Sequence, residues 1–157
     1  SQSDIPHDAP SGGQTLSEMR DSLEAIPGIV VADIAGGQKP NIKGNTGYAV
    51  GLEVEPGYAI ADGAALVDFV MASVREGYMP NARIDVRVRV SSSEGFDVGA
   101  AAAQAGWARE STSSPSSYST AAIDLAESKD QGARNLERLG PWPGDVPVAP
   151  TGVTVQE

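Results

Sequence analysis

The sequence predicts an α+β fold, in which a mixed sheet of about four strands has its helices packed mainly on one face. Two segments, 48–55 and 83–90, alternate apolar with polar residues, which is typical of strands with one buried and one solvated face. A helical pattern over 62–76 lies between them and forms a crossover, so the two strands can lie parallel in one sheet. The expected order of elements is α-β-β-α-β-α-β-α.

The first elements expected after the N-terminal region are a helix and a β-hairpin. A helix is expected over 16–26, because Thr15 and Glu18 have the spacing of a capping box ahead of an apolar stripe. The segment 29–34, IVVADI, predicts a short strand. This strand can pair with 48–55 as a hairpin, with a long polar loop between them.

The middle of the chain supplies the crossover helix and the clearest strand. Asp62 is the expected N-cap of the helix over 62–76. The strand over 83–90 has the sharpest alternation in the chain, with isoleucine and valine at every second position. Asp97 then predicts the cap of a short alanine-rich helix over 98–107.

The last part of the body adds one strand and one helix. A serine-rich linker leads to a fourth strand over 118–125, and a final helix is expected over 130–139. In that helix, Ala133, Leu136 and Leu139 have the spacing of an inward face.

Composition at the two ends predicts three regions. Residues 1–14 are polar and rich in Pro and Gly, so they are expected to form a flexible tether. Residues 15–139 form a single α+β domain, and residues 140–157 form a Pro-rich tail that cannot be helical. Trp142 lies between two prolines of this tail and can dock on the domain or on a partner.

Charge and cysteine content exclude several classes of protein. The chain of 157 residues carries a formal net charge of −10 and contains no cysteine. A disulfide scaffold, a thiolate metal site and a cysteine nucleophile are therefore excluded. The negative charge argues against nucleic acid or an anionic membrane as a partner, and no segment is apolar enough to span a membrane.

The sequence carries no recognisable catalytic set. Its only histidine, His7, lies in the expected tether, where it cannot hold the geometry that general-base catalysis requires. One histidine without cysteine cannot supply a zinc site, and neither a calcium loop nor a phosphate-binding loop is present. We expect no catalytic residues, no metal and no cofactor.

Strand 83–90 presents the first candidate partner-binding residues, Arg83, Arg87 and Arg89. If this strand lies beside 48–55, the arginines can pair with Glu53 and Glu55 across the solvated face. If it does not, they form a basic stripe on an acidic protein, which is a candidate site for an anion or a partner.

Two loops are further candidate contact surfaces. Lys43 and Asn45 lie in the loop 35–47, next to and within a G-x-x-G sequence that resembles the backbone clamp of KH domains. A KH clamp joins two helices, whereas this one is expected to join strands, so we interpret it as a turn. The serine-rich loop 111–117 is the second surface.

These observations predict a non-catalytic bacterial domain that acts in binding or assembly with a protein or cell-envelope partner. The polar tether and the acidic, cysteine-free composition favour a secreted or envelope-tethered, lipoprotein-like protein. One alternative is a structural subunit of a virion or filament, whose tails reach over neighbouring subunits. A second alternative is a small carboxylate-dependent hydrolase that uses two of the 21 acidic residues.

Overall fold

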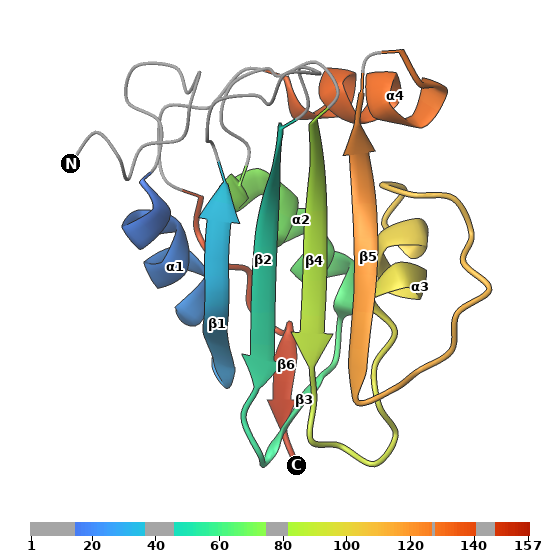
Figure 1. Ribbon diagram of the computed structural model, residues 1–157. Helices are drawn as coiled ribbons and strands as arrows, with labels where there is room; N and C mark the ends of the chain where they lie inside the picture. Colours follow the sequence, from blue (N-terminus) through green and yellow to red (C-terminus); the bar gives the residue numbers. More distant parts are fainter. Residues whose placement is uncertain (1–14, 37–45, 75–81, 127, 141–146) are drawn as a thin grey trace.

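A four-stranded mixed sheet with strand order β1-β2-β4-β5 forms the centre of the structure (Figure 1). The computed structural model describes residues 15–36, 46–74, 82–126, 128–140 and 147–157. The sheet consists of β1 (Ile29–Gly36), β2 (Thr46–Val54), β4 (Ala82–Arg89) and β5 (Tyr118–Leu125). β2 runs parallel to β4, and the two edge strands β1 and β5 are antiparallel to their neighbours. The predicted hairpin and the predicted parallel pair are both confirmed.

Helices lie mainly behind one face of this sheet. They are α1 (Leu16–Glu24), α2 (Gly63–Val74), α3 (Val98–Gln104) and α4 (Asp130–Leu139). α2 contacts α1 on one side and α3 on the other, and in Figure 1 the strands stand in front of α2. α4 lies at the end of β5. The predicted α+β architecture, with helices mainly on one face, is confirmed.

The helix starts follow the capping residues in the sequence. Thr15 accepts a hydrogen bond from the backbone N–H of Glu18 at 3.0 Å, and the Glu18 carboxylate accepts one from the N–H of Thr15 at 3.1 Å. Asp62 accepts from a backbone N–H in the first turn of α2 at 3.0 Å, and Asp97 does the same for α3 at 3.0 Å. Each cap satisfies a backbone donor that the helix itself leaves unpaired.

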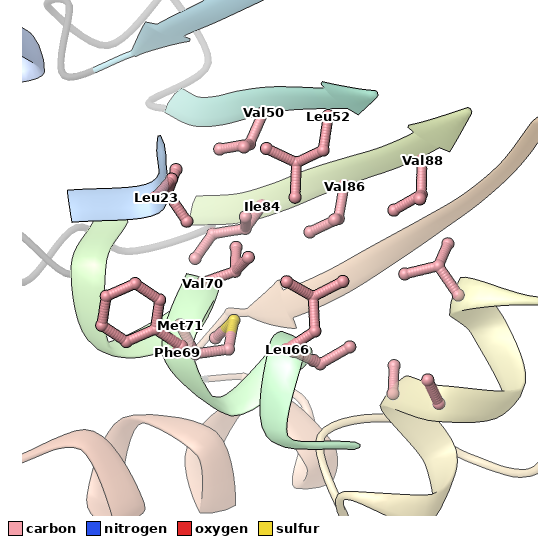
Figure 2. Close-up of a cluster of buried hydrophobic side chains, with 14 of the residues drawn as sticks. Leu23, Val50, Leu52, Leu66, Phe69, Val70, Met71, Ile84, Val86 and Val88 are labelled. Atoms are coloured by element: carbon pink, nitrogen blue, oxygen red, sulfur yellow. The ribbon is translucent and has the colours of Figure 1, made fainter. Parts of the chain in front are cut away.

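One hydrophobic core fills the space between the sheet and the helices (Figure 2). Val50, Leu52, Ile84, Val86 and Val88 supply its sheet side, and each is at most 2% exposed. Its helix side comes mainly from α1 and α2, whose fully buried residues include Met19, Leu23, Leu66, Val67, Val70 and Met71. Complete burial of such a side chain contributes about 1.5–3 kcal/mol, so this layer is the main source of stability.

A second, two-stranded sheet returns the end of the chain to the domain. β3 (Tyr58–Ile60) pairs antiparallel with β6 (Thr154–Gln156). The carbonyl of buried Val153 accepts hydrogen bonds from two backbone N–H groups just before α2, at 2.8 and 3.1 Å. The sequence pattern predicts neither strand, because a three-residue strand has too few positions to show alternation.

A buried amide fixes α4 against the rest of the fold. Asn135 is 1% exposed, and its Nδ2 donates to the carbonyls of Trp107 at 3.0 Å and Asp124 at 2.9 Å. The buried residues of α4 are Gly132 and Asn135, while Ala133 is exposed. Leu136 and Leu139 pack against the core as expected. The expectation that Ala133 faces inward is wrong, because the inward side of the helix also carries Asn135, the donor for these two carbonyls.

We expect the substitution Asn135→Ala to lower the free energy of unfolding by about 2 kcal/mol or more, because it removes the donor for two carbonyls. Urea unfolding followed by circular dichroism measures this change. Arg134→Ala, on the exposed side of the same helix, is the matched control and should stay within about 0.5 kcal/mol of the native chain. Equal unfolding midpoints for the two variants would contradict this role of Asn135.

Candidate functional site

The face of the sheet opposite the helices is the candidate site, and we call it the open face. It faces the viewer in Figure 1, and no helix of the described part of the chain lies over it. Strand register places its side chains, because outward residues alternate with core residues. They are Val30, Asp33, Ala35, Gly47, Ala49, Gly51, Glu53, Arg83, Asp85, Arg87, Arg89, Tyr118, Thr120, Ala122 and Asp124.

An ion pair crosses the centre of the open face. Asp33 on β1 and Arg87 on β4 both stand opposite Gly51 of the strand between them. The Arg87 guanidinium donates to the Asp33 carboxylate directly over this glycine. A Cβ atom on Gly51 would overlap Oδ1 of Asp33, so the glycine leaves the space in which the two side chains meet.

A β-bulge puts Asp33 on this face. The pairing of β1 with β2 shifts between Val31 and Asp33, so that Ala32 is the extra residue. Without the shift, Asp33 would share the inward face with Val31 because side chains alternate along a strand. The bulge therefore turns a carboxylate from the core side to the solvated side of the sheet.

Arg87 is the most constrained cation of the open face. Its side chain is 32% exposed, and its Nε is buried without a hydrogen-bond partner in the described part of the chain. Partial burial lowers the pKa of Arg87, but the hydrogen bond and charge of Asp33, together with Tyr118, outweigh this effect and raise it. The guanidinium is therefore a permanent charge, held in place by Asp33.

The other two predicted arginines have different surroundings. Arg83 pairs with Asp85 of its own strand at 3.2 Å, and both side chains are well exposed. Arg89 lies over the ring of Tyr118, with 4.6 Å from its Cζ to the ring centroid. The expected pairs with Glu53 and Glu55 do not form among the described residues, although the strands are neighbours and Glu53 stands opposite Arg89 in register.

The structure brings together half of the predicted partner-binding residues. Arg83, Arg87 and Arg89 share the open face, whereas Lys43, Asn45 and Trp142 lie outside the described residues. The serine-rich loop 111–117 is exposed along its length.

One residue of the serine-rich loop is anchored to a helix cap. The hydroxyl of Ser113 donates to both carboxylate oxygens of Asp97, each at 2.8 Å. Asp97 also caps α3, so these contacts hold the loop against the start of that helix. Within the described ranges, no group of three or more His, Cys, Asp or Glu side chains could hold a metal ion.

Comparison with known protein families, characterised proteins and solved structures finds no match. None of the described helices is long and apolar enough to cross a membrane. Function must therefore be inferred from the chemistry of the chain's own surface.

The open-face residues that the sequence did not predict for the site include Asp33, Gly51 and Tyr118. Gly51 carries a usable signal, because a glycine inside an alternating strand marks a close approach by another group. Asp33 carries none, since a bulge is needed to place it outward. The position of Tyr118 beside Arg89 depends on the order of the strands, which the sequence pattern does not define.

We expect Gly51→Ala to lower the free energy of unfolding by about 1–3 kcal/mol, because the added methyl group displaces Asp33 from Arg87. Urea unfolding of four chains tests this: native, Gly51→Ala, Asp33→Ala and the double variant. In the Asp33→Ala background the clash is absent, so the alanine at position 51 should cost nothing or stabilise the strand slightly. An equal cost in both backgrounds would show that Asp33 is not what the glycine accommodates.

Proposed function

We propose that this chain is a non-catalytic binding or assembly domain that engages a protein partner through the open face of its sheet. The observation that carries this proposal is one row of residues that crosses all four strands. Val30, Glu53, Arg89 and Tyr118 stand opposite one another in register. We call them the cross-sheet row.

The cross-sheet row has the composition of a contact surface. Val30 is 37% exposed and Tyr118 is 44% exposed, and both are among the exposed large hydrophobic residues of the described chain. Tyr and Arg, together with Trp, are enriched among the side chains at the energetic centre of protein interfaces. Both are presented here on strands rather than on a loop, so a partner meets a surface that is already ordered.

The chemistry of the row defines what the partner offers. Arg89 has no carboxylate partner among the described residues, and it lies over an aromatic ring that fixes its direction. A carboxylate of the partner supplies the missing charge, and an apolar side chain covers Tyr118 or Val30. The chain's net charge of −10 argues against nucleic acid.

The predicted location and the two alternative functions stay predictions. A secreted or envelope-tethered position in a bacterial cell is tested by fractionation of the source organism with an antibody to this chain. If the chain is a virion or filament subunit, the purified chain should form large assemblies at high concentration. If the chain is a carboxylate-dependent hydrolase, it should hydrolyse a substrate in a screen of glycosides. Substitution of an acidic residue should then abolish that activity.

We expect an immobilised native chain to retain a partner from an envelope extract of the source organism, and the double variant Arg89→Glu/Tyr118→Ala to retain at least tenfold less of it. Charge reversal repels the partner's carboxylate, and truncation of Tyr118 removes the apolar contact. Mass spectrometry of the retained proteins, followed by titration of the purified partner, gives the two affinities.

Arg134→Glu is the matched control, because it makes the same charge change on the exposed side of α4, away from the open face. It should bind like the native chain. A partner that binds the native chain and the double variant equally would show that binding uses another surface. A folded native chain that retains no protein would count against the proposed function itself.

A further inference from the structure

The two edges of the sheet differ in how their backbone groups are satisfied. The first part of β1 is closed by α1 (Figure 1). Arg20 Nη1 donates to the carbonyl of Val31 at 2.9 Å, and the N–H of Val31 donates to the Glu24 carboxylate at 2.9 Å. The N–H of Ile29 also has a partner, since it donates to the carbonyl of Ile26. Side chains and backbone of the α1 region thus occupy the groups that another strand would need.

The outer edge of β5 has no such cover over its middle. The N–H of Val90 donates to the carbonyl of Ser117 at 2.9 Å, which sets the phase of the β4–β5 ladder. Backbone groups of odd-numbered residues of β5 therefore face β4, and those of even-numbered residues face outward. In the described part of the chain, the N–H and carbonyl groups of Thr120 and Ala122 have no intramolecular partner, and both residues are exposed.

Hydrogen bonds at the two ends of this segment confirm that the backbone groups of even-numbered residues point away from β4. At one end, the carbonyl of Tyr118 accepts a hydrogen bond from Ser116 Oγ at 2.8 Å. At the other end, the carbonyl of Asp124 accepts from Asn135 Nδ2 at 2.9 Å. The chain thus satisfies both ends of the edge with its own side chains. Between them, the backbone N–H and carbonyl groups of Thr120 and Ala122 are left without a partner in the described part of the chain.

We propose that a second copy of this chain pairs with the outer edge of β5, antiparallel and about a two-fold axis at Ala121, to form one continuous eight-stranded sheet. In this register Thr120 of each copy faces Ala122 of the other, and each of these pairs exchanges two backbone hydrogen bonds. The central side chains are small, so neither face of the new ladder is crowded. Such a contact is isologous and closes on itself as a dimer.

Charge complementarity selects a second copy as the occupant. The same register places Tyr118 of one copy opposite Asp124 of the other. Arg89 lies over Tyr118, so its guanidinium meets the carboxylate of the second copy's Asp124. Within one chain, Oδ1 of Asp124 accepts a hydrogen bond from the N–H of Ala126 at 2.9 Å, and Oδ2 lies 3.6 Å from Lys129, whose side chain is 69% exposed. The axis generates the Arg89–Asp124 contact twice.

This proposal goes beyond the proposed function because its backbone hydrogen bonds lie at a strand edge, although both proposals use Arg89 and Tyr118. Light scattering coupled to size-exclusion chromatography, from about 1 µM to about 1 mM, measures the dimerisation of the native chain. The mass should rise from 16.1 kDa toward twice that value. A native chain that stays at 16.1 kDa throughout would overturn the proposal, and so would a monomer whose β5 edge binds an extended segment of another protein instead.

Ala122→Pro is the decisive variant, because it removes an outward N–H without touching a hydrogen bond to β4. We expect it to weaken dimerisation at least tenfold, whereas Ala122→Thr, which keeps the N–H, should dimerise like the native chain. Equal dimerisation of the proline variant, shown to be folded by circular dichroism, would overturn the proposal. A folded, monomeric proline variant that still captures the envelope partner would separate the two proposals from each other.

A cross-link tests the register even if the proline variant does not fold. Ala121 faces its own copy across the axis in a non-hydrogen-bonded pair, at a Cα separation of about 4.5 Å that suits a disulfide. The native chain has no cysteine, so Ala121→Cys introduces the only thiol. Mild oxidation should give a covalent dimer of this variant and none of Val30→Cys, on the opposite edge. Failure of Ala121→Cys to cross-link would overturn the register.

Discussion

One-sided burial of β2 and β4 is the constraint on which the rest of the structure depends. Every second residue of these two parallel strands is a buried aliphatic or aromatic side chain, and the residues between them point to solvent. A sheet with this pattern has one face to cover, so α1, α2 and α3 collect behind it and α2 packs on its centre (Figure 2). The same pattern leaves the opposite face uncovered. The ion pair over Gly51 and the cross-sheet row both lie on this uncovered face.

Much of the fold could be predicted because its main elements are long enough to show their period. The strand over 118–125 and the helix over 130–139 have the predicted bounds, and three predicted helix caps form as expected. The small sheet of β3 and β6 could not be predicted in this way, since it depends on backbone contacts between segments almost a hundred residues apart. The burial of Asn135 in α4 could not be predicted either, because this side chain satisfies two carbonyls that only the folded chain brings together.

The sequence predicted which arginines lie in the candidate site, but not which side chains each of them contacts. Alternation along the strand placed Arg83, Arg87 and Arg89 on a solvated face, and this is correct. Their partners depend on strand order and on one bulge, which are properties of the assembled sheet. Arg87 is therefore occupied by Asp33, while Arg89 is left beside an aromatic ring with no carboxylate. This difference makes Arg89, rather than the three arginines together, the centre of the proposed contact surface.

Amide hydrogen exchange of β5, resolved residue by residue by NMR, tests the register of the sheet and its free edge most directly. At low protein concentration, the N–H groups of Ser119, Ala121 and Ile123 should exchange slowly because they face β4, and those of Thr120 and Ala122 should exchange fast. Alternating protection of this kind requires both the observed register and an edge that the chain leaves free. Uniform slow exchange at low concentration would contradict the account, because it would mean that the chain covers its own edge.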